Sequence, residues 1–356
     1  MPVDRQSPLT KPAQLQPGDR IAAVSLSWGG PGTFPWRYQA GKRQLEAAFG
    51  VQVVEMPHTL ADAAWLARNP QARADDLMTA FSDPGIRGII STIGGDDSIR
   101  LLPHVDLSVL RENPKVFMGY SDTTVSHFLC RAAGLVSFYG PSFMAGFGEN
   151  GGLLPYMTAA VRRILFSAET PGLVEPNRDG WTVEHLDWAD PTLQERKRVL
   201  QPCTGWRFLQ GEGTVRGRLI GGCLEVLDWL RGSPLWPEPH EWSGSILFIE
   251  TSEEAPSPES VVRMLRALRA AGALEHLSGL LVGRPGGQVD PAQFPVYDRA
   301  VLQVICDEMG NTKLPIVAGM DFGHTDPMMV LPMGVEAEIN CEMQTFAILE
   351  AGVIAR

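Results

Sequence analysis

The sequence predicts an α/β protein whose N-terminal part is built on a parallel sheet. Apolar runs typical of buried strands alternate with segments whose apolar residues follow a helical period. Glycine-containing turns follow two of these runs, as expected where strands lead into helices. At 356 residues the chain is about twice a common single-domain length, so we expect two domains with a large buried core.

The first part of the chain supports the parallel sheet segment by segment. Expected strands cover residues 20–26, 51–56 and 86–93, and expected helices cover residues 38–49, 72–81 and 98–102. Each strand is followed by a helix before the next strand begins. Such an order favours βαβ units, in which neighbouring strands run parallel.

The second part of the chain is expected to be richer in β structure. Expected strands cover residues 214–220, 245–249, 277–282, 316–318, 330–332 and 345–349, and expected helices cover residues 224–230 and 259–271. Residues 168–205 are rich in Pro, Trp and charge, lack periodicity and are long for a plain connection. We predict domains at 1–167 and 206–356, with 168–205 as a linker or substrate loop.

Composition excludes several classes of partner. The chain has 41 acidic and 30 basic side chains, a formal charge of −11, and no dense Lys/Arg run, which argues against binding a nucleic-acid polymer. Its five cysteines are widely spaced without a CxxC pair, so neither a disulfide framework nor a zinc knuckle is expected. Residues 1–18 lack an apolar signal core and no run approaches membrane-spanning length, which predicts a cytoplasmic protein without a membrane partner.

The most informative motif is Gly119-Tyr120-Ser121-Asp122, which follows the apolar run 116–118 and precedes a helix-like stretch. A sharp strand-to-helix turn exposes a hydroxyl above the sheet edge and aims helix N–H groups at any oxyanion formed there. Ser121 is therefore the candidate nucleophile.

A second turn, Gly94-Gly95-Asp96, also follows an expected strand. Ligands of parallel sheets gather beyond the carboxyl ends of the strands, so both turns could face one pocket. We assign the oxyanion hole to the N–H groups of Gly95 and Asp122, and substrate contacts to Gly94 and Asp96. A tight turn without a ligand is the alternative for the glycine pair.

A serine nucleophile needs a base and a carboxylate that orients the base. His324 lies in a polar turn, residues 321–327, between two apolar runs, whereas His127 is expected to point away from Ser121. Glu250 ends a buried strand, where a carboxylate needs a partner. A structural turn histidine and a helix N-terminal acid remain alternatives for these two residues.

Three tryptophans, Trp181, Trp188 and Trp206, lie in or beside the 168–205 segment. An indole held over a cleft could stack on a planar ligand such as a nucleobase. The alternative is that these side chains fix the loop to the protein.

Taken together, five motifs resemble the serine peptidases of the LD-carboxypeptidase and microcin C immunity type, over nearly the whole chain. The motifs are Gly94-Gly95-Asp96-Asp97-Ser98, Gly119-Tyr120-Ser121-Asp122, Gly221-Gly222-Cys223-Leu224, Phe248-Ile249-Glu250-Thr251-Ser252 and Gly323-His324-Thr325-Asp326-Pro327-Met328. One departure is Cys223, where the family commonly has asparagine, so a hydrogen-bonding amide is missing.

This resemblance implies a triad of Ser121 as nucleophile, His324 as general acid and base, and Glu250 as the residue that orients the histidine. It also implies an N-terminal Rossmann-like domain, a C-terminal α/β domain with a β-barrel-like sheet, and an active site between them. A homodimer without metal or cofactor is implied as well.

The long 168–205 segment is similar to the loop of the microcin immunity branch, in which a tryptophan stacks on adenine, and Trp188 is the matching position. The expected function is hydrolysis of the amide bond of aminoacyl- or peptidyl-nucleotide toxins for immunity or detoxification. One alternative is LD-carboxypeptidase action on muropeptides. Another is a non-catalytic protein that binds a nucleotide-like ligand.

Overall fold

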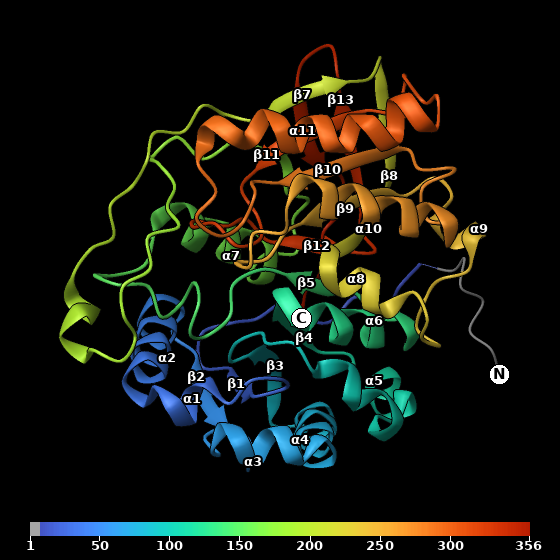
Figure 1. Ribbon diagram of the computed structural model, residues 1–356. Helices are drawn as coiled ribbons and strands as arrows, with labels where there is room; N and C mark the ends of the chain where they lie inside the picture. The colour runs from blue at the N-terminus through green and yellow to red at the C-terminus, as the bar shows by residue number, and fades with distance from the viewer. Residues whose placement is uncertain (1–7) are drawn as a thin grey trace.

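The computed structural model describes residues 8–356, which fold around two sheets (Figure 1). In this part of the chain the first sheet has six strands in the order β12-β5-β4-β3-β1-β2. They are β1 (Arg20–Val24), β2 (Gln52–Glu55), β3 (Ile86–Ser91), β4 (Val116–Gly119), β5 (Ser137–Tyr139) and β12 (Leu331–Met333). Strands β1 to β5 pair in parallel, which confirms the predicted parallel sheet, and β12 joins β5 antiparallel.

Helices connect the parallel strands. They are α1 (Gly30–Thr33), α2 (Pro35–Phe49), α3 (Ala63–Arg68), α4 (Pro70–Ser82), α5 (Leu107–Glu112), α6 (Thr124–Ala132) and α7 (Pro155–Leu165). The predicted helix 38–49 is confirmed as α2, which begins with Pro35 and ends at Phe49, where Gly50, a glycine with φ 70°, caps it. The predicted helix after Gly95 is instead the 3₁₀ helix η1 (Ser98–His104), which contains Pro103, a residue without the N–H that an α-helix needs.

Within residues 8–356 the second sheet has eight strands in the order β6-β14-β13-β8-β9-β10-β11-β7. They are β6 (Gly172–Val174), β7 (Arg207–Gln210), β8 (Thr214–Cys223), β9 (Ile246–Glu250), β10 (Gly279–Gly283), β11 (Ile316–Met320), β13 (Glu336–Asn340) and β14 (Thr345–Ile348). Strands β8 to β11 pair in parallel and the outer strands pair antiparallel. Because β6 and β7 form its two edges, the sheet is open and not a closed barrel.

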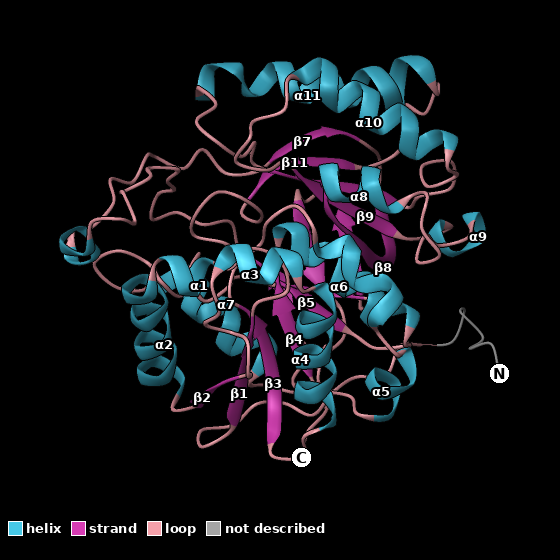
Figure 2. Cartoon of the chain, turned by 60° about the horizontal axis from the view of Figure 1, so that its bottom comes forward, coloured by secondary structure: helices cyan, strands magenta, loops and turns pink. Residues whose placement is uncertain are grey.

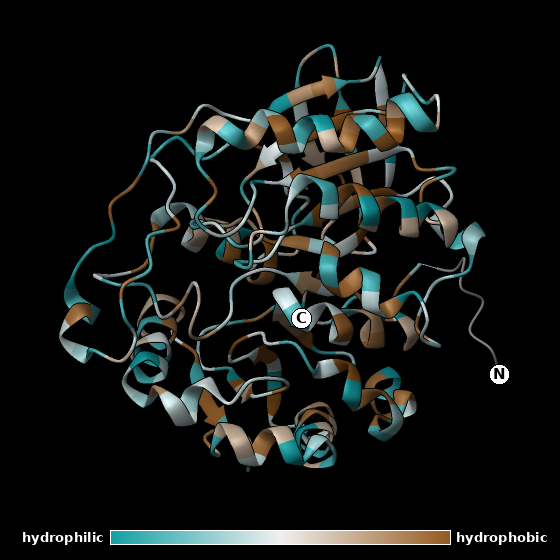
Figure 3. Ribbon diagram, in the orientation of Figure 1, coloured by the Kyte–Doolittle hydropathy of each residue, from teal (hydrophilic) through white to brown (hydrophobic). Residues whose placement is uncertain are grey.

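The second half carries α8 (Leu224–Leu230), α9 (Pro239–Trp242), α10 (Pro258–Ala270) and α11 (Phe294–Leu302), with short helices η2 (Ser121–Thr123), η3 (Pro191–Glu195), η4 (Pro291–Gln293) and η5 (Gln303–Glu308) elsewhere. Helices α10 and α11 lie together over the second sheet (Figure 2). Both carry apolar and polar residues, as the brown and teal segments show (Figure 3). In α10 the buried residues Val261, Leu265 and Leu268 recur at the helical period, so burial of that face stabilises the helix against the sheet.

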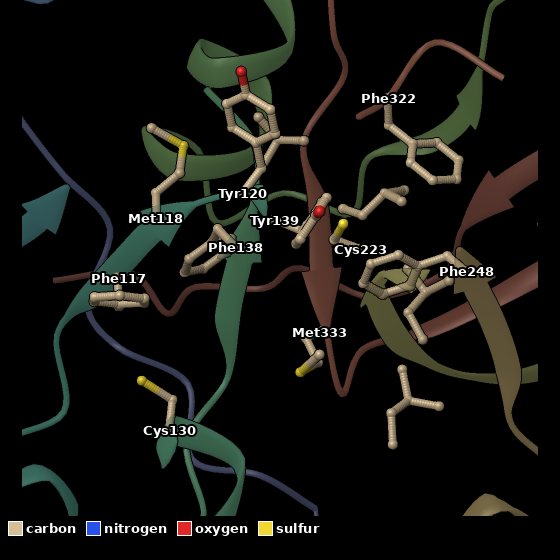
Figure 4. Packing of buried hydrophobic residues seen from close by; sticks show 14 of the residues in the cluster. Phe117, Met118, Tyr120, Cys130, Phe138, Tyr139, Cys223, Phe248, Phe322 and Met333 are labelled. Atoms are coloured by element: carbon tan, nitrogen blue, oxygen red, sulfur yellow. The ribbon is translucent and has the colours of Figure 1, made fainter. Parts of the chain in front are cut away.

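The two sheets meet through a shared apolar core. Tyr139 of β5, Phe248 of β9 and Phe322 lie close together where the sheets approach one another (Figure 4), with ring centroids 5.3 Å apart for the first pair and 6.0 Å for the second. This contact brings the carboxyl ends of β4, β5 and β9 to one place. The two sheets and their helices confirm the predicted α/β class.

The predicted domain boundaries at residues 167 and 205 stay a prediction. Two strands pair with a sheet that belongs mainly to another predicted part of the chain. Strand β6 lies inside the 168–205 segment yet pairs with β14, and β12 joins the first sheet. From the sequence we expect no signal peptide in residues 1–18, and residues 1–7 of that segment lie outside the described residues. In residues 8–356 we find no helix with the length and apolar character needed to cross a membrane.

Candidate active site

Ser121 occupies a strained turn directly after β4. Its φ is 63°, a left-handed backbone conformation that costs a residue other than glycine roughly 1–3 kcal/mol. Two contacts hold this conformation: the Ser121 N–H donates to the Tyr139 hydroxyl at 3.1 Å, and Thr124 Oγ1 donates to the Ser121 carbonyl at 2.7 Å. The strain exposes the serine as a nucleophile elbow does.

The glycine turn after β3 lies against this serine. A Cβ atom on Gly94 would lie 2.8 Å from both Cβ and Oγ of Ser121, so only glycine fits there. Gly95 has φ 147°, and a Cβ on it would lie 2.2 Å from Ser27 Oγ. The structure thus brings the two sequence-predicted turns together at one cavity.

Asp122 is fully buried and fixes the serine turn to η1. Its Oδ2 accepts from the Ser98 N–H at 2.8 Å, and its carbonyl accepts from Ser98 Oγ at 2.8 Å. Burial raises the pKa of the Asp122 carboxyl above its ordinary value. Its own N–H group lies beside Gly94, 3.4 Å from where a Cβ atom on that glycine would lie. Asp96, by contrast, is exposed and lies outside the residues that line the cavity.

Glu250 and His324 form a buried pair. His324 Nδ1 lies 2.6 Å from Glu250 Oε2, and the side chains are 7 % and 0 % exposed, respectively. A Cβ on Gly323, which has φ 92°, would lie 2.6 Å from the Glu250 side chain, so this glycine permits the close approach. His127, as expected, points elsewhere: its ring contacts the Gly119 carbonyl and Ser137, and burial lowers its pKa to about 4.

Tyr139 is a site residue that the sequence reasoning missed. Its hydroxyl donates to Glu250 Oε1 at 2.5 Å and accepts from the Ser121 N–H, so one side chain connects the serine turn to the carboxylate. Tyr139 lies in the short strand β5, which pairs in parallel with β4 and places Tyr139 opposite Gly119. Three residues are too few for periodicity to reveal a strand.

The second ring nitrogen of His324 also contacts a carboxylate. His324 Nε2 lies 3.0 Å from Glu253 Oε2, and within residues 8–356 no hydrogen bond joins His324 to Ser121 Oγ. Burial alone would lower the pKa of His324, but the carboxylates of Glu250 and Glu253 raise it to about 10. The hydrogen bond to His324 in turn lowers the pKa of Glu253 to about 2. This arrangement holds the imidazole protonated.

A protonated imidazole cannot act as a base, so activity is expected to depend on pH. In the wild type, kcat/KM should rise about tenfold per pH unit from neutrality towards a limit near the His324 pKa of about 10. Glu253→Gln removes one of the two carboxylates that raise the His324 pKa, so the rising part of the kcat/KM profile should move to lower pH. Glu254→Gln, at the adjacent exposed residue, should leave the profile unchanged. Profiles of kcat/KM check this, and a wild-type plateau already reached at pH 7 would contradict it.

Ser121 and His324 line the same cavity, of about 460 Å³. A second compartment of about 250 Å³ adjoins it, and the two share Ala145, His185, Trp188, Glu253, His324 and Asp326 in their walls. We call the two compartments together the cleft. A space of this size suits a small molecule rather than a polymer.

Trp188 lies in the wall of both compartments. Its ring packs edge-on against Phe34 at 6.1 Å, the Arg37 guanidinium lies 4.8 Å from the ring centroid, and its carbonyl accepts from Trp36 Nε1 at 2.7 Å. Trp181 is buried beside Phe294, and Trp206 Nε1 donates to Asp321 at 2.7 Å. Of the three tryptophans, Trp188 is thus the one that faces the cleft, and the other two fix the segment.

The 168–205 segment is fastened to the histidine turn. Thr182 and Asp326 exchange two backbone hydrogen bonds, at 2.7 and 3.0 Å. Arg198 donates to Asp326 at 2.7 Å and to Glu149 Oε1 at 2.8 Å, so the same side chain also reaches the first half of the chain. The segment therefore forms a wall of the cleft.

Two further expectations concern cysteine and metal. Cys223 is buried, its Sγ contacts Glu225 at 3.4 Å, and it lies outside the residues that line the cleft. Burial raises the pKa of its thiol well above the ordinary value. Among residues 8–356, no group of three or more His, Cys, Asp and Glu side chains is placed to hold a metal ion.

A two-sheet α/β fold with a serine on a strained turn, near a histidine bound to a buried carboxylate, has the features of a serine hydrolase. The chain belongs to the LD-carboxypeptidase family: the model of its N-terminal domain matches residues 21–140 and that of its C-terminal domain matches residues 216–339. This confirms the family resemblance inferred from the motifs.

Comparisons with individual proteins cover almost the whole chain. A relative from Vibrio cholerae, named as a carboxypeptidase, is 32% identical over 96% of this chain and 98% of its own. The structure of an MccF-like protein from Streptococcus pneumoniae in complex with AMP has a TM-score of 0.84 and 33% identity, over 93% of this chain and 98% of that one. The Escherichia coli microcin self-immunity protein MccF in complex with aspartyl sulfamoyl adenosine has a TM-score of 0.83 and 28% identity, over 97% and 100%.

Proposed function

We propose that this protein is a serine amidase that cleaves the acyl bond of small aminoacyl-nucleotide compounds. The observation that carries the proposal is that Ser121, His324 and Trp188 line one cleft. The first two would perform the chemistry, and the third would bind a nucleobase. The ligands in the two related structures, AMP and aspartyl sulfamoyl adenosine, support a nucleotide-like substrate.

The first step starts from the neutral form of His324, which has lost its Nε2 proton to water. Ser121 Oγ then attacks the acyl carbon while its proton passes to His324 Nε2. The N–H groups of Gly95 and Asp122 stabilise the oxyanion, as pre-positioned backbone donors do. The bond between the acyl carbon and the leaving nitrogen then breaks, and His324 gives its proton to that nitrogen. The product is an ester between the acyl group and Ser121.

In the second step, water attacks the ester and His324 takes a proton from the water. The free acid leaves, and the Ser121 oxygen recovers its proton from His324. Glu250 keeps His324 Nδ1 protonated through the 2.6 Å contact, which balances the transient imidazolium charge. Because Nε2 must face Ser121 in both steps, it has to leave Glu253 when substrate binds.

The Trp188 assignment gives a test of substrate class. Trp188→Ala should raise KM for an aminoacyl sulfamoyl adenosine by roughly 5- to 150-fold, since stacking of a base on an aromatic ring contributes about 1–3 kcal/mol. Hydrolysis of a non-nucleotide substrate should be unaffected. Steady-state kinetics check this, with Trp229→Ala as the control, because Trp229 is an exposed tryptophan of α8 outside the cleft wall. Equal KM values for wild type and Trp188→Ala would refute the stacking role.

A second candidate function is LD-carboxypeptidase action on muropeptides, and the family's own domain description supports it. The same serine, histidine and glutamate would cut a peptide bond in that case. Inhibition by AMP separates the two, because only a cleft that binds a nucleobase predicts it. A role in immunity or detoxification, residence in the cytoplasm and a homodimeric assembly stay predictions from the family resemblance.

A further inference from the structure

Glu253 lies at the centre of the cleft but has no part in the proposed chemistry. It lines both compartments, and its Oε2 is 3.0 Å from His324 Nε2, the nitrogen that must serve Ser121. Its side chain is 73% exposed, so it is open to the cleft rather than packed in the core. A carboxylate in this place affects any ligand that reaches Ser121.

The loop that carries Glu253 is firmly built. Glu225 Oε1 accepts from both the N–H and the hydroxyl of Ser252, at 2.9 and 2.6 Å. The Gly286 N–H donates to Thr251 Oγ1 at 3.1 Å, and the Ala255 N–H donates to the Ser252 carbonyl at 3.1 Å, which closes a turn around Glu253. A backbone held on both sides of Glu253 keeps this residue at the cleft wall even when the contact with His324 is broken.

Glu253 loses its partner when the enzyme is ready to react. Among residues 8–356, His324 is the cation in contact with its carboxylate, and that contact ends once Nε2 turns to Ser121. The neighbouring arginines are engaged: Arg198 pairs with Glu149 and Asp326, and Arg37 bonds to Asn150 and lies over Trp188. A carboxylate shielded from water by a ligand then needs a cation supplied by that ligand.

The position of Glu253 next to His324 Nε2 indicates which cationic group of a ligand could reach it. Glu253 contacts the nitrogen that serves the nucleophile, so the cation must lie close to the reacting acyl carbon. In an aminoacyl group the α-nitrogen is about 2.5 Å from that carbon, from standard bond lengths. The ammonium of a lysine side chain lies four methylene groups further away.

We propose that Glu253 binds the free α-ammonium group of the acyl residue. The substrates are then aminoacyl nucleotides with an unblocked amino group, and N-acylated or peptidyl forms are poor substrates. This inference rests on the proposed function and narrows it. It also disfavours muropeptides, whose α-nitrogen at an internal scissile bond is an uncharged amide.

The test compares alanyl sulfamoyl adenosine with its N-acetyl derivative, because alanine has no other charge near the acyl carbon. Wild type should favour the free amine by roughly 10- to 100-fold in kcat/KM, as for a hydrogen bond between charged groups. Glu253→Gln should reduce this ratio to near one, and Glu254→Gln, which changes the neighbouring exposed acid, should keep it. The same ratio should appear in affinities measured by calorimetry with Ser121→Ala, and should vanish in Ser121→Ala/Glu253→Gln.

The outcomes separate this inference from the function on which it rests. Hydrolysis of both compounds at equal rates, or an unchanged ratio in Glu253→Gln, would overturn the role of Glu253 and leave the amidase standing. Absence of hydrolysis together with an amine-dependent affinity would support Glu253 and overturn the amidase. Failure of both compounds to bind would overturn both.

Discussion

Replacing Ser121 by alanine is expected to lower kcat by roughly 10⁴- to 10⁶-fold, because the triad groups act as a unit. The two contacts that hold the φ of 63° use the N–H and carbonyl of residue 121, which alanine retains, so stability should be about equal. Steady-state hydrolysis of an aminoacyl sulfamoyl adenosine, with a melting temperature for the same sample, measures both effects.

Ser126→Ala is the matched control for this substitution. Ser126 is buried in α6, and its hydroxyl has no hydrogen-bond partner in the described part of the chain. Its removal should leave kcat unchanged. A Ser121→Ala protein with wild-type turnover would exclude the serine mechanism, and binding without turnover in both proteins would favour the non-catalytic alternative.

Replacing Glu250 by glutamine is expected to lower kcat by about 10⁴-fold. A neutral amide at this position no longer fixes the tautomer of His324 or balances the imidazolium. It also changes the partner of the Tyr139 hydroxyl, which joins Glu250 to the serine turn. The loss should appear in kcat with little change in KM, since Glu250 lies outside the residues that line the two compartments next to Ser121.

Thermal unfolding and circular dichroism of Glu250→Gln establish whether the fold is intact, since the side chain is fully buried. Glu254→Gln makes the same chemical change at an exposed position of the next loop and should retain full activity. A Glu250→Gln protein that is folded and within tenfold of wild-type kcat would mean that another group orients His324.

Much of the fold could be predicted because it is recorded in local patterns. The long strand β8 and the helix α10 show clear periodicity, and the turn at Ser121 is marked by its glycine and the apolar run before it. By contrast, β5 and β6, of three residues each, are missing from the predicted strands. Strand β12 is predicted as 330–332, but its place in the first sheet is decided by tertiary pairing.

The same distinction applies to the site. Residues at strand ends, such as Ser121 and Glu250, could be found from sequence because their position has a local signature. Tyr139 and Glu253 could not, since each acts through a partner more than 70 positions or a whole sheet away in the fold, at 2.5 Å from Glu250 and 3.0 Å from His324, respectively. The packing of the two sheets against each other creates the first contact, and the pairing of β9 and β11 with β10 inside the second sheet brings the loops that carry Glu253 and His324 together.

The most direct test of the central claim is mass spectrometry of the products formed when wild type and Ser121→Ala are incubated with an aminoacyl sulfamoyl adenosine and with an L,D-linked muropeptide tetrapeptide. We expect release of the amino acid from the adenosine compound by wild type alone. Cleavage of the tetrapeptide alone, or of neither compound, would contradict the assignment of this cleft to aminoacyl nucleotides.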